Sequence, residues 1–452
     1  MPAGPLSVAG VILAAGLSTR FGGEKLTAPL AGKPLAYHAI EAVLASSLDR
    51  VVVVTRPELA DPLGRAFPGA EMVVNEQAAQ GQAGSLRLGV EALRPRESHV
   101  LFLLADQPLV SPALIDSFVA AARTGEELAA LAGDGRLSPP ALFGRRFFAE
   151  LAQARGDAGG RGLLAAQGGR VLALPPNHPL AGLDVDRPQD LARAEAVLAG
   201  RLGKALGLRR RELVSVVGAG GKTSLVAALA SERAAAGQAV LATTTTQVYH
   251  PPGRLLMEQD PQRLLADAAQ RLVPGWLLNL ATDSRVEDGR AKLQGLSPGA
   301  VDRLWEQSLT PLLLVEADGA RRLPLKAPRA HEPATPSASS AVVGVMGLGG
   351  LGKPVDEKHV FAPHEFSTLT GAARGQAVEP GHLAALVLHP QGLFKNAPPL
   401  ARRVVFMNQD EAPGAARAAR EIASRIQEKE ASLRVVLASL AQGWSEVLAS
   451  GG

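Results

Sequence analysis

The 452-residue chain is predicted to be an α/β protein with two domains. Strand-like aliphatic runs alternate with amphipathic helical stretches, a pattern typical of parallel sheets covered by helices. A glycine-rich loop follows a strand-like run twice, in LAAGLSTRFGGEK and again in VVGAGGKTSL. A chain of this length is also too long for one ordinary hydrophobic core. We therefore expect two Rossmann-like domains, residues 1–203 and 204–452.

The elements of the first domain follow from periodicity and from turn residues. Apolar runs bounded by Gly, Pro or Asp predict strands, and apolar residues three or four positions apart predict helices. Strands are expected at 8–13, 50–55, 71–74, 100–104 and 171–174. Helices are expected at 35–45, 86–92, 112–122, 145–154 and 188–200.

Composition excludes several classes of function. The chain is 46% hydrophobic and 20% charged, which indicates a globular protein. Its net charge of +4 is dispersed and aromatics make up 4%, so no nucleic-acid partner is expected. The absence of cysteine excludes disulfides, thiolate ligands and Cys nucleophiles. No membrane span or charged leader is apparent, and a cytoplasmic location is expected.

The first glycine-rich loop has the composition of a triphosphate site. Glycines let backbone amides approach phosphate oxygens, and Arg20 and Lys25 supply positive charge. A second strand-like run, HVLFLLADQP, ends in Asp106. A carboxylate at the end of a strand is well placed to hold Mg²⁺ against phosphates, although alone it would more often form a turn or a helix cap.

Three further segments extend this first site. Gly81 and Ser85 lie just ahead of a helix, where backbone amides can contact a base or ribose. Asp184 and Asp186 precede another helix, and either could be a second metal ligand or a helix cap. The segment RGDAGGRGLL is predicted to be a third glycine-rich loop, with Asp157 and Arg161 as candidate contacts to a pterin or ribose.

Together LAAGLSTRFGGEK, the ADQP around Asp106, GQAGSLRLGV and DVDRPQDL resemble the MobA-like nucleotidyltransferases. The resemblance covers about the first 200 residues and is greatest to the branch that attaches CMP to molybdopterin. Residues 13–16 read LAAG, which is similar to the motif of that branch, whereas guanylyl enzymes tend to have LAGG. It implies a nucleotidyltransferase-type α/β/α sandwich that uses CTP and Mg²⁺. It also implies catalytic roles for Arg20, Lys25 and Asp106 and a nucleotide-binding loop formed by Leu13, Ala14, Ala15, Gly16 and Gly22.

The second glycine-rich loop predicts another nucleotide site. Gly218, Gly220 and Gly221 would expose backbone amides, and Lys222 with Thr223 resembles the Lys and Mg²⁺-binding hydroxyl of a P-loop. Ser224 follows in the same turn. The spacing is shorter than GxxxxGK(S/T) and is similar to the GxxGKT loops of Mur ligases.

Other segments of the second half support nucleotide binding. The strand-like run LLLVEADGA ends in Glu316 and Asp318, in the manner of a Walker B carboxylate. VVFMNQD resembles a base-reading element of GTPases without its lysine, and residues 243–246 either reach Mg²⁺ or form a buried strand. Residues 328–340 are rich in Pro and Ser and are predicted to be an ordered loop of this domain, the alternative being a boundary to a third domain.

These segments, with LPLKAPRAHEP and GLGGLGKPVDEKHV, resemble the YqeC family from about residue 212 to 427. That family implies a P-loop NTPase-like accessory domain, using ATP or GTP, for selenium-dependent molybdenum hydroxylases. The expected protein is a molybdenum cofactor cytidylyltransferase fused to this domain, with a molybdopterin-type substrate and a hydroxylase apoenzyme as partner. Two alternatives are a nucleotidyltransferase using another phosphate or GTP, and a cofactor carrier without turnover.

Overall fold

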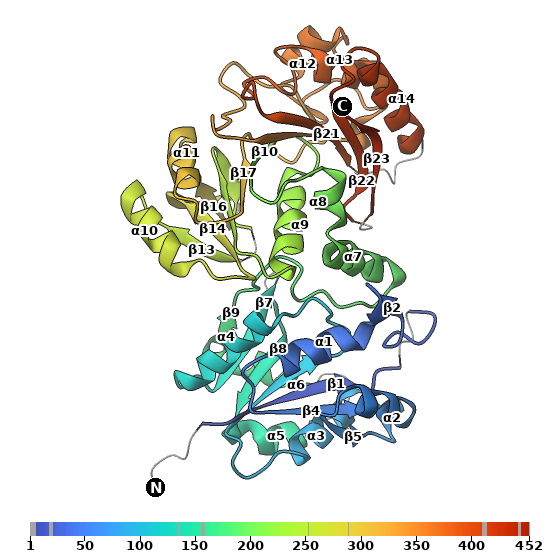
Figure 1. The fold of residues 1–452 in the computed structure, drawn as a ribbon, viewed down its shortest axis with the longest axis vertical. Coiled ribbons are helices and arrows are strands. Elements are labelled where there is room, and N and C mark those ends of the chain that lie inside the picture. The colour runs from blue at the N-terminus through green and yellow to red at the C-terminus, as the bar shows by residue number, and fades with distance from the viewer. Residues whose placement is uncertain are drawn as a thin grey trace. The chain divides into compact units, whose positions relative to one another are not determined.

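The computed structural model describes residues 6–17, 21–133, 136–154, 159–251, 253–287, 289–408, 414–441 and 444–451. The chain forms two compact units, Met1–Glu195 and Ala196–Gly452, and each is built around its own large sheet (Figure 1). Parallel strand pairs dominate both sheets, so the predicted α/β class is confirmed.

The first unit contains a seven-stranded sheet in the order β5-β4-β1-β6-β8-β7-β9. Strand β8 is antiparallel to β6 and β7, and the other neighbouring pairs are parallel. The elements are β1 (Val8–Ala14), β2 (Pro29–Leu30), β3 (Lys33–Pro34), α1 (Leu35–Leu44), β4 (Arg50–Thr55), α2 (Pro57–Ala66), β5 (Glu71–Val74), α3 (Gln82–Glu91), β6 (His99–Leu104), α4 (Pro112–Arg123), β7 (Leu128–Gly133), β8 (Arg136–Gly144), α5 (Phe148–Ala152), α6 (Gly159–Gln167), β9 (Leu172–Leu174) and α7 (Pro188–Ala199).

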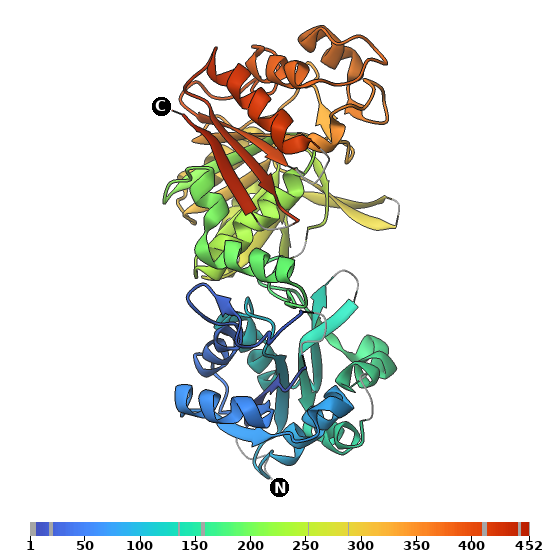
Figure 2. The same ribbon diagram turned by 90° about the vertical axis from the view of Figure 1, so that its right-hand side faces the viewer.

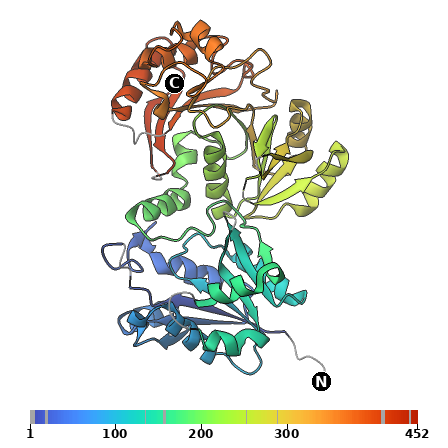
Figure 3. The same ribbon diagram turned by 180° about the vertical axis from the view of Figure 1, so that it is seen from behind.

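Helices cover both faces of this sheet. Side chains of α3, α5 and α6 form one core with β1, β4 and β6, while α1 and α4 contact each other as part of the other layer (Figure 3). Helix α3 lies close to β1 because Gly89 has no side chain: a Cβ there would be 2.6 Å from Cγ1 of Val11. The central strand β1 is apolar along its whole length, as a parallel strand covered on both faces requires.

Some elements of the first unit differ from the prediction. The helix expected at 86–92 begins earlier, at Gln82, and the stretch 145–154 forms a 3-10 turn followed by the short α5. The pattern did not reveal α2 or the antiparallel pair β7–β8. The expected loop at 155–164 is wrong in its second part, because α6 begins at Gly159; Arg155 and Asp157 lie outside the described residues.

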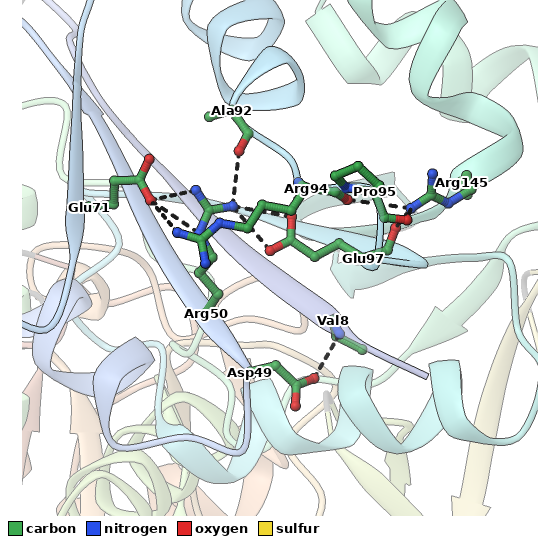
Figure 4. Close-up of polar contacts among 9 residues, drawn as sticks. All are labelled: Val8, Asp49, Arg50, Glu71, Ala92, Arg94, Pro95, Glu97 and Arg145. Carbon is green, nitrogen blue, oxygen red and sulfur yellow. Dashed lines mark hydrogen bonds and ion pairs between the residues drawn. The ribbon is translucent and has the colours of Figure 1, made fainter. Parts of the chain in front are cut away.

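An ion-pair network ties the amino ends of the strands together (Figure 4). Arg50, which begins β4, donates to Glu71 Oε2 at 2.6 Å and to the fully buried Glu97 at 3.1 Å. The hydrogen bonds from Arg50 hold the pKa of Glu71 below its ordinary value. Asp49 accepts from the backbone of Val8 at 2.8 Å. These groups satisfy one another at the amino edge, so the network is structural.

The second unit contains a nine-stranded sheet in the order β13-β14-β11-β17-β10-β19-β21-β22-β23, in which only the β22–β23 pair is antiparallel among the described residues. Its elements are α8 (Arg201–Ala205), β10 (Glu212–Gly218), α9 (Lys222–Ala235), β11 (Val240–Thr244), β12 (Gln247–Tyr249), β13 (Arg254–Met257), α10 (Pro261–Arg271), β14 (Leu277–Ala281), β15 (Asp283–Glu287), β16 (Arg290–Gln294), α11 (Pro298–Glu306), β17 (Leu312–Glu316), β18 (Leu325–Lys326), β19 (Ala341–Gly347), β20 (Val360–Phe361), α12 (Pro363–Thr370), α13 (Pro380–Leu388), β21 (Arg402–Asn408), α14 (Ala415–Gln427), β22 (Arg434–Ser439) and β23 (Trp444–Ser450).

Three hydrophobic clusters pack against this sheet. Helices α8 and α9 cover one face, and the other face is covered by α10 and α11 at one side and by α12, α13 and α14 at the other (Figure 1). Strands β12, β16 and β15 form a separate three-stranded sheet, whose β15–β16 hairpin projects in yellow in Figure 2.

Residues 328–340 run as an irregular segment of the second unit. Its backbone at Ala334 accepts from Thr245 at 2.7 Å, and Ser339 is hydrogen-bonded to Ser215 at 2.8 Å. Within the described residues, no helix combines the length and apolar character that crossing a bilayer demands.

Glu232 on α9 predicts a pH dependence of stability. Burial raises its pKa to about 7, even though it accepts from the backbone of Leu202 and Gly203. The folded protein therefore holds a proton that the unfolded chain releases above pH 4.5, so this contribution to stability falls as pH rises from about 4.5 to 7. At about 1.4 kcal/mol per pKa unit, the loss is on the order of 3 kcal/mol.

Urea unfolding of wild type and Glu232→Gln across pH 5–8 measures this term. The difference in unfolding free energy between the two proteins should decline with rising pH, in favour of the variant. A difference that is flat across this range would contradict it.

Candidate functional site

The first candidate site lies at the carboxyl ends of β1 and β6. From β1 the chain passes to β4 on one side and later to β6 on the other, so the sheet order reverses beside β1. Open α/β sheets bind ligands at such a point. Leu13 and Ala14 end β1, Ala15 and Gly16 begin the glycine-rich loop, and the Leu13 carbonyl accepts from Ala105 at 3.1 Å. This pairing brings the loop beside Asp106.

Lys25 joins the two predicted halves of this site. Its Nζ donates to Asp106 Oδ2 at 2.7 Å and to Asp186 Oδ1 at 3.2 Å. Lys25 is 7% exposed, whereas the Asp186 side chain is about half exposed. Burial alone would lower the pKa of Lys25, but the charges and hydrogen bonds of the two aspartates outweigh it and raise the pKa above its ordinary value. The ammonium therefore stays charged between two carboxylates.

Asp184 has different surroundings from Asp186. Its Oδ1 accepts from the buried Gln107 side chain at 2.9 Å, and the same amide donates to the Pro139 carbonyl at 3.2 Å. The backbone amides of Asp186 and Arg187 donate to Asp190, which satisfies the start of α7. Of the two candidate ligands, the structure brings Asp186 to Lys25 and Asp106.

The pair Asp106 and Asp186 suits a divalent cation. Oδ1 of Asp106 is buried and has no hydrogen-bond partner among the described residues. No group of three or more potential ligand side chains occurs in the part of the chain that the structure describes. Mg²⁺ is commonly held by one or two carboxylates together with phosphate oxygens and water, so two carboxylates beside a phosphate loop fit it.

The described glycines of the first glycine-rich loop are not crowded by the part of the chain that the structure describes. A Cβ built on Gly16, Gly22 or Gly23 meets no described atom within 4 Å, and Gly22 has a φ of +81°. Arg20, predicted to be catalytic, lies outside the described residues. At the start of α3, Gly81 has a φ of +106°, whereas the Ser85 hydroxyl is buried and accepts from Asn75 at 2.8 Å. A contact with the base there stays a prediction for the backbone.

Arg56 was missed by the sequence reasoning. It follows β4 directly, donates to the Gly16 carbonyl at 3.0 Å and pairs with Glu24. It thus holds both ends of the glycine-rich loop. Its position after a strand that neighbours β1 was the available signal, because the carboxyl ends of parallel strands share one edge.

The second candidate site surrounds the loop between β10 and α9. Strand β10 lies between β17 and β19, and the chain runs to opposite sides of β10 before and after β17. The loop glycines are required by close approach: a Cβ at Gly220 would be 2.4 Å from the backbone of Gly347, and one at Gly221 2.4 Å from the Asn408 amide. A Cβ at Gly218 would likewise be 2.3 Å from the Val345 carbonyl oxygen.

Lys222 and the end of β17 form a second lysine–carboxylate cluster. Nζ of Lys222 donates to the Gly218 carbonyl at 2.6 Å and lies 3.2 Å from Asp318 Oδ1 and 3.8 Å from Glu316. Thr223 donates to Glu316 at 2.9 Å. Burial raises the pKa of Glu316, although Lys222 opposes this. The structure therefore brings together the lysine, hydroxyl and two carboxylates that were predicted for this site.

The neighbouring segments complete this cluster. Lys326, which the sequence reasoning overlooked, lies 3.2 Å from Asp318 and 2.8 Å from Glu332. Thr243 and Thr244 are buried in β11 and bond to backbone carbonyls, which favours the buried-strand alternative for them. Asn408 donates to the Gly220 carbonyl at 3.0 Å; the adjoining Gln409 and Asp410 lie outside the described residues.

A cavity of about 1100 Å³ opens at this loop. Gly220, Gly221, Lys222, Thr223 and Ser224 line one part of it, together with Glu316. Residues of β12, of the β15–β16 hairpin and of the segment 319–324 line the rest.

Comparison with known proteins identifies both halves. Residues 10–171 match the family model of the MobA-like NTP transferase domain, and residues 214–364 match that of the YqeC protein. The uncharacterized protein YqeC of Escherichia coli (strain K12) is 37% identical over 207 residues, which are 44% of this chain and 77% of that protein. The purine catabolism protein PucB of Bacillus subtilis (strain 168) is 32% identical over 196 residues, 41% of this chain and 95% of PucB.

The chain is a MobA-like NTP transferase domain followed by a YqeC domain. The transferase domain makes the protein a nucleotidyltransferase. It also resembles a probable molybdenum cofactor guanylyltransferase of Thermococcus sibiricus (strain DSM 12597 / MM 739), with 37% identity over 111 residues, 24% of this chain and 53% of that protein.

Removal of Lys25 from the transferase domain should tighten metal binding in the absence of nucleotide. The ammonium occupies one oxygen of each carboxylate, so Lys25→Met removes this ammonium from Asp106 and Asp186. We expect Mn²⁺, followed by electron paramagnetic resonance, to bind several-fold more tightly to this variant. Lys33→Met, which removes the surface pair with Glu41, is the control. Unchanged or weaker Mn²⁺ binding in Lys25→Met would contradict the assignment.

Proposed function

We propose that the transferase domain is a molybdenum cofactor cytidylyltransferase, which transfers CMP from CTP to Mo-molybdopterin and releases pyrophosphate. The cluster of Lys25, Asp106 and Asp186 at the carboxyl ends of β1 and β6 is the observation that carries this proposal. The similarity to a probable molybdenum cofactor guanylyltransferase supports a molybdopterin-type substrate, and the LAAG motif at residues 13–16 supports CTP as the nucleotide.

The chemistry needs no nucleophile from the protein. An oxygen of the terminal phosphate of molybdopterin attacks the α-phosphorus of CTP in line, and the bond to the pyrophosphate oxygen breaks. Asp106 and Asp186 would hold Mg²⁺, which neutralises charge on the phosphates when bound. Lys25 and Arg20 would hold the leaving pyrophosphate, and the glycine-rich loop would present backbone amides to it. Asp184 would keep Gln107 in place beside Asp106.

Turnover of three carboxylate variants tests this division of roles. Asp106→Asn should lower kcat for pyrophosphate release by at least about 100-fold, the usual order for loss of a group that stabilises transferring charge. Asp186→Asn should mainly raise the Mg²⁺ concentration needed, and Asp184→Asn should have the smallest effect. Near-normal turnover of a folded Asp106→Asn protein would refute the metal assignment.

The choice of nucleotide is tested separately. Anaerobic incubation with molybdopterin, Mg²⁺ and either CTP, GTP or ATP should release pyrophosphate fastest with CTP. A preference for GTP would make the domain a guanylyltransferase, the second candidate that the relative from Thermococcus favours. Release only with another phosphate acceptor would replace molybdopterin, and bound but unconsumed CTP would indicate a carrier.

For the YqeC domain we propose an NTP-dependent accessory role in the maturation of selenium-dependent molybdenum hydroxylases. The loop from Gly218 to Thr223 would bind ATP or GTP, with Glu316 near the Mg²⁺ held by Thr223. Lys222→Ala should weaken binding of a Mg²⁺–ATP or Mg²⁺–GTP analogue at least tenfold, measured by calorimetry, without changing pyrophosphate release by the transferase domain. Equal binding by Lys222→Ala and wild type would exclude this loop as the nucleotide site.

A further inference from the structure

The cavity of the YqeC domain has a strongly basic wall that faces the glycine-rich loop. Arg285, Arg290 and Lys292 come from the β15–β16 hairpin, and Arg321 and Arg322 come from the segment after β17. Among the described residues, with Lys222 included, six cationic side chains line the cavity against two carboxylates, Glu287 and Glu316, so the formal charge of this described lining is +4.

Three of these guanidinium groups form no ion pair with the part of the chain that the structure describes. Lys292 pairs with Glu287 at 2.6 Å and Arg285 with the same carboxylate at 3.2 Å. Among the described residues, Arg290, Arg321 and Arg322 have no carboxylate oxygen within 4.0 Å. Cations gathered without partners around a cavity raise the local concentration of anions there.

Tyr249 of β12 holds part of this wall together. Its ring lies 4.7 Å from the Arg322 guanidinium, 4.8 Å from that of Arg290 and 5.8 Å from the Lys292 ammonium. Such cation–π contacts offset some of the repulsion between like charges. Because cations occupy the surroundings of the ring, we assign Tyr249 to their positioning.

The backbone at Arg321 and Arg322 is held in an unfavourable conformation. Their φ angles are +48° and +63°, in the left-handed region that side chains rarely adopt. Two consecutive residues of this kind are energetically unfavourable, and such conformations concentrate at ligand sites. The strain is unexplained by packing of the two arginines, since both side chains are exposed.

The charge exceeds what a nucleotide on the glycine-rich loop requires. A Mg²⁺–nucleoside triphosphate carries a charge of about −2, because the metal ion neutralises part of the phosphate charge. Lys222 and the amino terminus of α9 already face that position. About two positive charges of the lining therefore remain for another anion.

We propose that this wall binds the phosphate or diphosphate group of a second ligand, beside the nucleotide on the loop. This ligand is either free diphosphate or a diphosphate-bridged dinucleotide, the chemical class of the product proposed for the transferase domain. That the ligand is a second one, bound beside a nucleotide, rests on the proposed nucleotide site at Gly218–Thr223. That the wall binds an anion rests on the cavity and its cations.

Calorimetry on the full chain tests it with two probes, inorganic pyrophosphate and FAD, a stable diphosphate-bridged dinucleotide. Each is titrated in the presence of saturating Mg²⁺ and a non-hydrolysable ATP analogue. Arg321→Gln/Arg322→Gln should weaken one pyrophosphate or FAD site at least tenfold and leave the ATP analogue unaffected, while Lys222→Ala should do the reverse. The transferase domain is the same in every variant, so its own binding cancels in the comparison.

Two further sets of variants serve as controls for the effect of the lost charge and for the role of the Tyr249 ring. Arg420→Gln/Arg425→Gln removes the same charge from exposed positions on α14 that do not line the cavity, and it should change binding less than twofold. Tyr249→Phe keeps the aromatic ring and should bind like wild type, whereas Tyr249→Leu should resemble the double arginine variant. Thermal melts establish that each protein is folded.

The outcomes are distinct. Binding of FAD with this dependence identifies a dinucleotide, and binding of pyrophosphate alone identifies free diphosphate. The proposal is overturned if neither probe depends on the arginines, if the control weakens binding equally, or if the arginine variant loses the ATP analogue as Lys222→Ala does. If the wild-type protein does not bind the ATP analogue but still binds a probe in an arginine-dependent way, the proposed nucleotide site is refuted and the proposed anion site on the basic wall is retained.

Discussion

A lysine held between carboxylates at the end of a neighbouring strand is the interaction on which both domains depend. Lys25 lies between Asp106 and Asp186, and Lys222 lies near Asp318 and Glu316. Both lysines are at most 7% exposed. A buried charge costs several kcal/mol unless it is paired, so each lysine and its carboxylates require one another. In both cases the lysine follows a glycine-rich loop, and the adjacent parallel strand leads into one or both carboxylates: Asp106 after β6, and Glu316 with Asp318 at the end of β17. Asp186 instead comes from the segment before α7.

This arrangement allows charged partners to be exchanged when phosphate arrives. Phosphate oxygens give the ammonium a new partner, and the carboxylates are then available to a divalent cation. The buried Oδ1 of Asp106, which has no hydrogen-bond partner within the described parts of the chain, already provides part of such a site. Because the charges are present before the ligand binds, little rearrangement of the backbone is needed. The network at Arg50, on the opposite edge of the first sheet, has no such exchange available, since its groups are satisfied where they are.

Sequence reasoning succeeded where the signal is local. The central strand β1 is apolar along its whole length and β10 is mostly apolar, and a glycine-rich loop after such a strand places Lys25 and Lys222 at a predictable edge. It failed where the structure of a segment is determined by its neighbours in the sheet and not by its own sequence. The β7–β8 pair depends on antiparallel pairing across the sheet, and Gly159 begins α6 despite its low helix propensity. Asp184 and Asp186 are two residues apart, so only packing against Gln107 or Lys25 separates them.

The basic wall was beyond prediction for the same reason. Arg285 and Arg290 are isolated in the sequence and Arg321 and Arg322 form a single pair, and each of these is by itself typical of a solvated surface. The topology brings them together: β12 pairs with β16, which carries Arg290 next to Tyr249, and the segment after β17 returns to the same cavity. The structure therefore shows a cluster of cations from separate elements, only some of which form ion pairs among the described residues. The amino-acid composition does not reveal this cluster. A net charge of +4 for the whole chain equals the formal charge of this one cavity lining, so the rest of the molecule is close to neutral. An anionic ligand would therefore be drawn to the cavity and not to the surface at large.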